Sequence, residues 1–476
     1  MNSPEPASRK APTELTRRRF VGVAAAAAAT GVVASTSSGL IGSAAAQAAP
    51  RSDDVVSWLN RRASPLRTLE PEGPLYDLAP LRRIVGNARL VGVGYDAHGT
   101  HNITTLHLRV IRFLVEHMGF RTVAWEESWG SGVEIDRYVA TGGGDRQAAH
   151  DLVLGAFPMV RHEAFVDVVR WLSEFNAHRP AHDRVRFLGS DSLEVREFLY
   201  ERVTQYVTDV APERLAELNE HLDPLRMHGG AQETVLWYVD PEKTEDWRDS
   251  IVAHGKAMFE IVQSLPDAPS EVAYLDAIQD AQNILGFYDF NSWKGTLADV
   301  REYYISETIN RWHKRVPNKI VYLAHNGHIA ANPNMVISIP PFDMNRTRVL
   351  TGHYFRRDFG DDYVGIGSAF GQGQIFVGWQ TGPTVTDIPA PDPSFIDYTL
   401  NQARHENYLL DLTDCGPVSP AVREWLNGPA KIRLVAAPYV PANDTEYKQL
   451  IDPWRGTGFD AMLFVKNVTT ARMFGL

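Results

Sequence analysis

Five acid and imidazole side chains lie after short apolar runs, in positions where their chemistry could be combined. They are, in chain order, His98, Glu126, Asp191, His325 and His328. Carboxylates and imidazoles are the side chains that most often move protons in general acid–base catalysis. A single histidine after a strand carries little weight, but such groups at four strand ends favour an active site.

Four apolar runs position these groups. Residues 90–94 lead into the turn that carries His98, residues 121–126 end in Glu126, residues 186–191 end in Asp191, and residues 319–328 end in two imidazoles. The β-branched content of these runs predicts buried parallel strands. If the strands are parallel, all five groups lie at one edge of a sheet, which is where open α/β sheets bind their ligands.

The pattern of the chain predicts an α/β fold with a mostly parallel central sheet flanked by helices. After the His98 turn, Ile103, Leu106 and Val110 recur at helical spacing, so a helix follows the first strand. Residues 194–312 show helical patterns only, and we expect a large helical insertion that covers the C-terminal ends of the strands. The predicted domains are a core part at 50–193, an insertion or lid at 194–312 and a second core part at 313–476.

Composition argues against several classes of protein. The 476 residues carry a net charge of −11, which disfavours non-specific nucleic-acid binding. Cys415 is the single cysteine, so the chain can form neither an internal disulfide nor a cysteine metal cluster. No serine lies in a Gly-x-Ser-x-Gly elbow, which argues against a serine α/β-hydrolase. We expect a monomer that acts on a small-molecule substrate without a cofactor.

The N-terminal residues 1–49 predict a twin-arginine signal peptide. Residues 16–20, Thr-Arg-Arg-Arg-Phe, precede an apolar stretch at 21–34, and Ala46-Gln-Ala48 offers a cleavage site. The apolar stretch is too short to span a membrane. We therefore expect export by the twin-arginine route, an extracellular or cell-envelope location, and no membrane anchoring after the signal is cleaved.

The motif Gly94-Tyr-Asp-Ala-His-Gly-Thr100 resembles the G-E-x-x-H-G-T turn of the erythromycin esterase family. The resemblance continues in matching order through Val123-Ala-Trp-Glu126, residues 135–139, residues 171–176, Gly189-Ser-Asp191, residues 301–307 and Ala324-His-Asn-Gly-His328. It implies a metal-independent esterase that opens macrolide lactones, with a histidine acting as base on water. His98 matches that base. Other active-site positions of the family are matched by Glu126, His325 and His328.

Three departures from the family pattern lie close to His98. Tyr95 stands where the family has a glutamate, Asn102 replaces a second glutamate, and His107 replaces a residue that is commonly arginine or lysine. A carboxylate beside an imidazole raises its pKa and stabilises the imidazolium, whereas tyrosine can hydrogen-bond but is uncharged at neutral pH. Asp96 could partly replace the lost acid from the adjacent position. These changes predict that macrolide cleavage has been lost.

We assign candidate roles to nine residues. The catalytic candidates are His98, Glu126, His325, His328 and Tyr95, and the substrate-binding candidates are Asp96, His107, Asp191 and Arg301. For hydrolysis, His98 would deprotonate a water that Glu126 orients, and His325 or His328 would donate a hydrogen bond to the developing oxyanion. Asp191 could instead cap a helix, and Arg301 could instead pair with the carboxylates at the sheet edge.

Three interpretations of the function stay open at this point. The first is a secreted esterase or lactonase that acts on a small hydrophobic, polyketide- or terpenoid-like molecule. The second keeps the His98 base but is a cyclase, lyase or dehydratase of natural-product biosynthesis, with Tyr95 as a hydrogen-bond donor. The third is a ligand-binding protein with a decayed active site. The three histidines and Glu126 could ligate a metal, but the resemblance implies none, so we expect no metal.

Overall fold

The computed structural model describes residues 53–266, 268–292, 297–340, 344–378, 384–436 and 439–476. The predicted signal peptide at 1–49 lies outside these residues, and export stays a prediction. Among the residues that are described, no helix is both long and apolar enough to cross a membrane.

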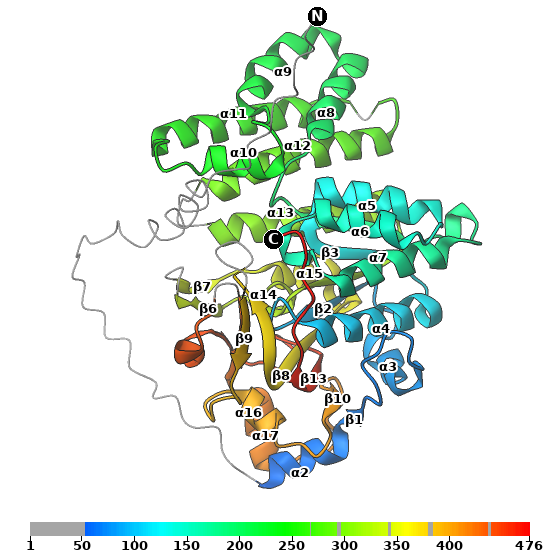
Figure 1. The fold of residues 1–476 in the computed structure, drawn as a ribbon, viewed down its shortest axis with the longest axis vertical. Coiled ribbons are helices and arrows are strands. Elements are labelled where there is room, and N and C mark those ends of the chain that lie inside the picture. Colours follow the sequence, from blue (N-terminus) through cyan, green and yellow to red (C-terminus); the bar gives the residue numbers. More distant parts are fainter. Residues whose placement is uncertain (1–52, 267, 293–296, 341–343, 379–383, 437–438) are drawn as a thin grey trace, which may run out of the picture.

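A nine-stranded sheet forms the centre of the fold (Figure 1). Six neighbouring strands are parallel, in the order β13-β8-β2-β5-β3-β4, while β10, β1 and β9 pair antiparallel to their neighbours. The strands are β1 (Ser64–Pro65), β2 (Leu90–Tyr95), β3 (Phe120–Ser128), β4 (Arg186–Asp191), β5 (Lys319–His325), β8 (Tyr363–Val377), β9 (Thr384–Ile388), β10 (Asn407–Asp411) and β13 (Ala461–Val468). The predicted mostly parallel sheet flanked by helices is confirmed.

Parallel pairing brings the polar strand ends to one edge. The apolar side chains of β2 and β5 are wholly buried, as expected for strands covered on both faces. In the β2–β5 pair Tyr95 lies opposite His325, and in the β3–β4 pair Ser128 lies opposite Asp191. The carboxyl ends of β2, β5, β3 and β4 are therefore adjacent.

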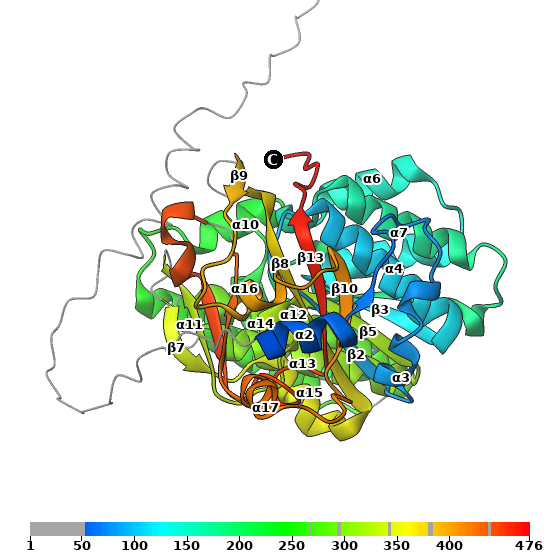
Figure 2. The ribbon, with the colours of Figure 1, turned by 90° about the horizontal axis from the view of Figure 1, so that it is seen from below.

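Helices flank the sheet and connect its strands. Those of the core are α2 (Asp53–Arg62), α3 (Leu81–Val85), α4 (His101–Met118), α5 (Trp129–Thr141), α6 (Arg146–Gly155), α7 (Glu163–Asn176), α14 (Asn326–Ile329), α15 (Thr351–Phe359), α16 (Ile396–Leu400) and α17 (Pro420–Asn427). Helix α4 packs against β3, β5 and β13, and lies with α6 and α7 on one side of the molecule (Figure 2). It ends at Gly119, whose φ of 77° is left-handed and favours glycine.

The described residues between β4 and β5 include six α-helices. They are α8 (Glu197–Val210), α9 (Leu215–Leu222), α10 (Ala231–Tyr238), α11 (Glu245–Gln263), α12 (Glu271–Asn291) and α13 (Leu297–Arg315). Figure 1 shows α8 to α12 as a layer at one end of the molecule, with α13 between this layer and the strands. No described residue between β4 and β5 belongs to a strand, in agreement with the helical patterns of the sequence. The exact domain boundaries stay a prediction.

A second, antiparallel sheet was not anticipated from the sequence. It has the order β11-β12-β6-β7 and consists of β6 (Met335–Ile339), β7 (Met344–Arg348), β11 (Ala430–Arg433) and β12 (Lys448–Ile451). Its strands have only four or five residues each and come from distant parts of the chain. Such short runs carry too little periodicity to distinguish strands from loops.

The contact between α5 and β4 depends on two glycines, and we predict that Gly132→Ala destabilises the fold. A Cβ atom at Gly132 would lie 2.3 Å from the backbone nitrogen of Gly189, which cannot rotate away. The gain in helix propensity, about 1 kcal/mol, is smaller than the cost of overpacking. We expect a net loss of about 1–3 kcal/mol in the free energy of unfolding, measured by urea denaturation.

Gly155→Ala is the matched control for this variant. Gly155 also lies in a helix, at the end of α6, but a Cβ atom there would meet open space. Its free energy of unfolding should stay unchanged or rise slightly. Equal stability of the two alanine variants would contradict the close approach of α5 to β4.

Candidate active site at the carboxyl ends of the parallel strands

The carboxylate of Glu126 lies at the centre of the group of polar strand ends. It is only 3% exposed, and four groups donate hydrogen bonds to it. Its Oε2 accepts from the hydroxyl of Tyr95 at 2.6 Å and from the backbone amide of His325 at 2.8 Å. Its Oε1 lies 2.8 Å from Nη2 of Arg301 and 3.2 Å from Nε2 of His328. Burial alone would raise the pKa of Glu126, but His328 and Arg301 hold it well below the usual value.

Arg301 joins the lid to two strands. It projects from α13, and the same Nη2 atom that reaches Glu126 lies 2.6 Å from Oδ2 of Asp191, while its Nε donates to the same carboxylate at 3.0 Å. Asp191 is the last residue of β4, and its Oδ1 also accepts from the amide of Ser192. The helix α8 begins only at Glu197. Asp191 and Arg301 thus form a largely buried ion pair, which was the alternative given for Arg301, whereas the alternative given for Asp191 was a helix cap.

The sequence alone did not identify Glu302. This residue is 2% exposed on α13, and its Oε2 lies 2.7 Å from Nδ1 of His328. The same oxygen accepts hydrogen bonds from the amide and the hydroxyl of Thr351, at 3.0 and 2.5 Å. Although burial disfavours the charged form of His328, the carboxylates of Glu302 and Glu126 raise its pKa to about 10. His328 is therefore an imidazolium at neutral pH.

His98 and His325 are neutral, in contrast to His328. Burial lowers the pKa of His98 to about 4 and that of His325 to about 3. The two ring centroids are 5.4 Å apart. Nδ1 of His325 accepts the amide hydrogen of Gly327 at 3.3 Å, which assigns the imidazole proton to Nε2. This Nε2 is buried and makes no hydrogen bond of normal geometry to a described residue, but a hydrogen bond between the ring and the backbone of Asp96 raises the pKa of His325.

Tyr95 contacts both His98 and the carboxylate of Glu126. Its ring meets the ring of His98 edge-on at 5.0 Å, and its hydroxyl is the group that donates to Glu126. Burial and the Glu126 charge raise the pKa of Tyr95 well above its usual value, so the phenol stays neutral and can only donate this bond.

Gly99 shapes the turn that carries His98, since its φ is 68° and a Cβ there would lie 2.0 Å from the carbonyl oxygen of Phe376.

Asp96 and His107 lie apart from the polar contacts of Glu126. The carboxyl of Asp96 is wholly buried, and burial together with the neighbouring Asp397 raises its pKa, while Arg433 lowers it. His107 is 1% exposed on α4, and its ring lies 6.1 Å from that of Tyr95. Burial lowers its pKa to about 4. The structure thus places both residues in the protein interior, and their contact with substrate stays a prediction.

Acid and imidazole groups like those of this site can also ligate metals. Within the described residues no group of three or more histidine, cysteine, aspartate or glutamate side chains has a metal-binding arrangement. Both nitrogens of His328 face carboxylates, and an imidazolium has no lone pair for a metal. The arrangement provides a neutral imidazole, a second neutral imidazole with an N–H donor, and a buried set of fixed charges.

Comparison with known proteins agrees with this site. The family model described as erythromycin esterase matches residues 115–468. This chain belongs to the erythromycin esterase family. The match includes Glu126, Asp191, Arg301 and both histidines of β5 and α14, but it begins after the turn that carries Tyr95 and His98. Membership of the erythromycin esterase family supports ester-hydrolase activity in general.

Individual relatives of this erythromycin esterase family member are distant. An erythromycin esterase type II from Escherichia coli is 22% identical over 333 residues, which is 65% of this chain and 75% of that protein. A putative hydrolase, YbfO, of Bacillus subtilis (strain 168) is 24% identical over 37% of this chain and 38% of its own length.

Solved structures show the same fold. A protein from Bacillus cereus has a TM-score of 0.72 at 23% identity, covering 88% of this chain and 98% of that one. A mutant erythromycin esterase, solved in its open conformation, has a TM-score of 0.63 at 16% identity, covering 87% and 99%. At these identities the likeness establishes the fold alone.

We predict that Glu302→Gln lowers the pKa of His328. Removing one of the two adjacent carboxylate charges should lower that pKa by about 1–3 units, so that the ring loses its extra proton at a lower pH. NMR spectra that correlate the ring nitrogens and ring protons of 15N-labelled histidines, recorded over a range of pH, report this change. The signal of His328 is assigned by its absence in His328→Asn. Glu307→Gln, on the same helix, is the control and should leave the spectrum of His328 unchanged. An unaltered pKa in Glu302→Gln would contradict the assigned charge.

Proposed function

We propose that this chain hydrolyses an ester or lactone bond in a small hydrophobic molecule, with His98 as the general base. The observation that carries the proposal is the pair of neutral imidazoles, His98 and His325, beside the buried Glu126 carboxylate. The first can accept a proton and the second can donate a hydrogen bond. An ester hydrolase needs both functions at one carbonyl group.

In the proposed reaction His98 removes a proton from a water molecule, and the oxygen of this water attacks the carbonyl carbon of the ester. A pKa of about 4 keeps His98 unprotonated at neutral pH, at the expense of weaker basicity. The negative charge of Glu126 favours the imidazolium that forms on His98. The base can then return the proton to the leaving alcohol.

Stabilisation of the oxyanion is assigned to His325. Its Nε2–H is buried and makes no hydrogen bond of normal geometry to a described residue, so a substrate oxygen could compete with the backbone of Asp96 for this donor. His328 is less suited to this role because both of its nitrogens already face carboxylates. Its fixed positive charge instead helps to keep Glu126 ionised.

The substrate is proposed to be a polyketide- or terpenoid-like ester or lactone other than a macrolide antibiotic. Tyr95 supports this choice, because its phenol occupies the position of the family glutamate and donates a hydrogen bond to Glu126. Twin-arginine export of the protein remains part of the proposal. A second candidate, a cyclase, lyase or dehydratase, is favoured by the same hydrogen bond, since a neutral donor beside the base suits a reaction without water.

Hydrolysis and its base are tested with p-nitrophenyl hexanoate, δ-dodecalactone and erythromycin. We expect turnover of the first two, with one 18O atom incorporated into the acid product from labelled water, and no turnover of erythromycin.

His98→Ala should lower the rate by about 10²–10⁴-fold. Because the pKa of His98 is lowered to about 4, kcat/KM should fall only as the pH drops through about 4, rather than through the usual imidazole value of about 6.5.

His117→Ala is the control, since this exposed histidine lies on α4 away from the strand ends. It should keep wild-type activity. Full activity of His98→Ala would refute the proposed base, and products without labelled oxygen would favour the non-hydrolytic candidate. Ligand binding without any turnover would favour a binding protein.

Substitutions at Tyr95 test whether the phenol belongs to the chemistry. Tyr95→Glu places a second carboxylate at the position that now donates to Glu126, and one of the two acids would have to be protonated. If the introduced carboxylate were the charged one, it would also raise the pKa of His98. We therefore expect Tyr95→Glu to impair turnover of the best substrate more than Tyr95→Phe, as measured by kcat/KM. Turnover by Tyr95→Glu equal to or above that by Tyr95→Phe would contradict this role of the phenol. Efficient erythromycin hydrolysis by the wild type would contradict the proposed substrate.

A further inference from the structure

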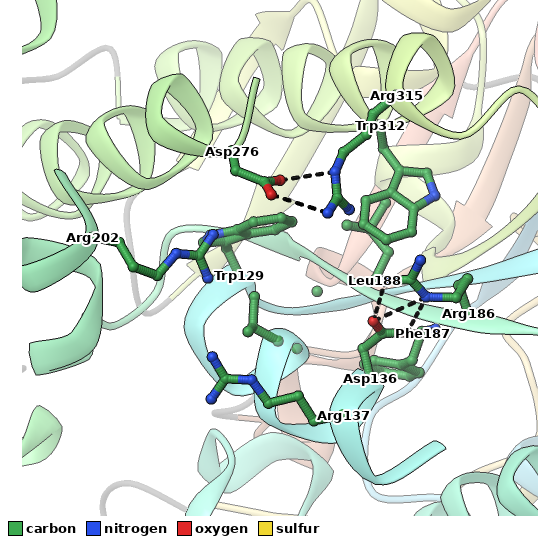
Figure 3. Close-up of a pocket in the computed structure, with 13 residues that line it drawn as sticks. Trp129, Asp136, Arg137, Arg186, Phe187, Leu188, Arg202, Asp276, Trp312 and Arg315 are labelled. Carbon is green, nitrogen blue, oxygen red and sulfur yellow. Dashed lines mark hydrogen bonds and ion pairs between the residues drawn. The ribbon is translucent and has the colours of Figure 1, made fainter. Parts of the chain in front are cut away.

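A separate cleft of about 350 Å³ lies beside the edge strand β4 (Figure 3). It is lined by residues of α5, β4, α8, α12 and α13, and by none of the catalytic candidates. Along α13 its Arg315 is about 21 Å from Arg301, at a helical rise of ~1.5 Å per residue. The cleft is thus distinct from the candidate active site. Its volume is within the range of small-molecule sites, roughly 300–1,000 Å³.

Four arginines line this cleft, against two aspartates, Asp136 and Asp276. The arginines are Arg137, Arg186, Arg202 and Arg315. In the view of Figure 3, Arg137 and Arg202 lie on one side, and Arg186 and Arg315 on the other. Each guanidinium has five N–H donors in a planar fork that suits carboxylate and phosphate oxygens.

Two of the arginines are held in place by carboxylates. Arg186 forms a bidentate pair with Asp136, with a closest distance of 2.5 Å. Arg315 pairs with Asp276 through Nε at 2.9 Å and Nη2 at 3.0 Å. Both bonds use one edge of the guanidinium. The remaining Nη1 donors of these arginines make no hydrogen bond to a described residue, and they stay available to a ligand.

Positive charge exceeds negative charge on the other side of the cleft. Nε of Arg202 lies 2.8 Å from the buried carboxyl of Asp280. Burial raises the pKa of Asp280 to about 7, in spite of Arg202, so part of this carboxyl is uncharged at neutral pH. Arg137 is exposed and stacks over the ring of Phe198 at 5.2 Å, but within the described residues it has no carboxylate partner.

Two largely buried tryptophans line part of the cleft, Trp129 at 4% and Trp312 at 5% exposed. The indole nitrogens of Trp129 and Trp312 donate to Asp280 and Thr122, at 2.8 and 2.9 Å, which fixes both rings. Arg186 and Arg315 each lie 5.2 Å from the ring of Trp312. A planar group that enters beside these rings would find an apolar surface and guanidinium donors together.

We propose that this cleft binds a small organic anion that has a carboxylate or phosphate group on a flat apolar body. The anion contacts the arginines, with Arg137 contributing the charge that no described carboxylate balances, and the apolar body contacts the small surface that Trp129 and Trp312 leave exposed. The proposal does not rest on the reaction proposed for His98, because the two sites share no residue.

Isothermal titration calorimetry on the full chain tests this site with phenyl phosphate, benzoate, inorganic phosphate and benzyl alcohol at constant ionic strength. We expect phenyl phosphate or benzoate to bind at least about tenfold more tightly than inorganic phosphate or benzyl alcohol, and their order identifies the preferred acid group. Arg137→Gln should weaken the binding of the better probe about tenfold, equivalent to about 1.4 kcal/mol.

Arg423→Gln is the matched control, because Arg423 is an exposed arginine on α17 and its loss changes the net charge equally. It should bind the probes as the wild type does. The absence of binding by both phenyl phosphate and benzoate, or equal affinity of the wild type and Arg137→Gln, would overturn the proposal. Repeating the titration with His98→Ala separates this result from the proposed hydrolysis, since the affinity should not change.

Discussion

Burial of the Glu126 carboxylate is the constraint on which the arrangement of the site depends. An ionised carboxylate in the interior is strongly unfavourable unless donors and cations surround it. Here a phenol, a backbone amide, a guanidinium and an imidazolium do so, and each comes from a different element: β2, β5, α13 and α14. The same charges determine which imidazoles are protonated. His328 lies between two carboxylates and is charged, while His98 and His325 are neutral, so a base and a cation coexist in a small volume.

The central sheet was predictable because its strands are buried on both faces and must be continuously apolar. Residues 90–94 and 319–325 show this pattern, and their ends carry the polar groups that mark the functional edge. The second sheet was not predictable. Its strand β12 reads Lys-Gln-Leu-Ile and pairs with β6, more than a hundred residues earlier in the chain. Such pairing depends on tertiary contacts and not on local sequence.

The sequence identified the site candidates that end strands, together with Arg301 on α13, but it did not identify Glu302 beside Arg301. Glu302 follows Arg301 in the sequence, and a helical pattern with many polar residues does not indicate that both point toward the strands. The signal that was available for Glu302 is its place directly after Arg301 in a helix with many aromatic residues. Asp96 shows the converse limit, because its place beside Tyr95 suggested the site, whereas its charged neighbours in the structure are Asp397 and Arg433. The direction in which a side chain points from a turn depends on how distant segments pack around it, and the local sequence does not show this packing.

Helix α13 attaches the helices between β4 and β5 to the central sheet. Near its start, Arg301 and Glu302 bind groups on β3, β4 and α14. Near its end, the indole of Trp312 donates to Thr122 at the beginning of β3, and Arg315 pairs with Asp276 of α12. These polar anchors are buried or half-buried, so breaking one leaves an unpaired charge or donor in a poorly hydrated place, at a cost of about 1–3 kcal/mol or more. Displacing Arg301 would leave the carboxylates of Glu126 and Asp191 without their cation, and an ester or lactone oxygen, which only accepts hydrogen bonds, could not replace it. The anchors of α13 therefore have to stay in place while a ligand binds beside them.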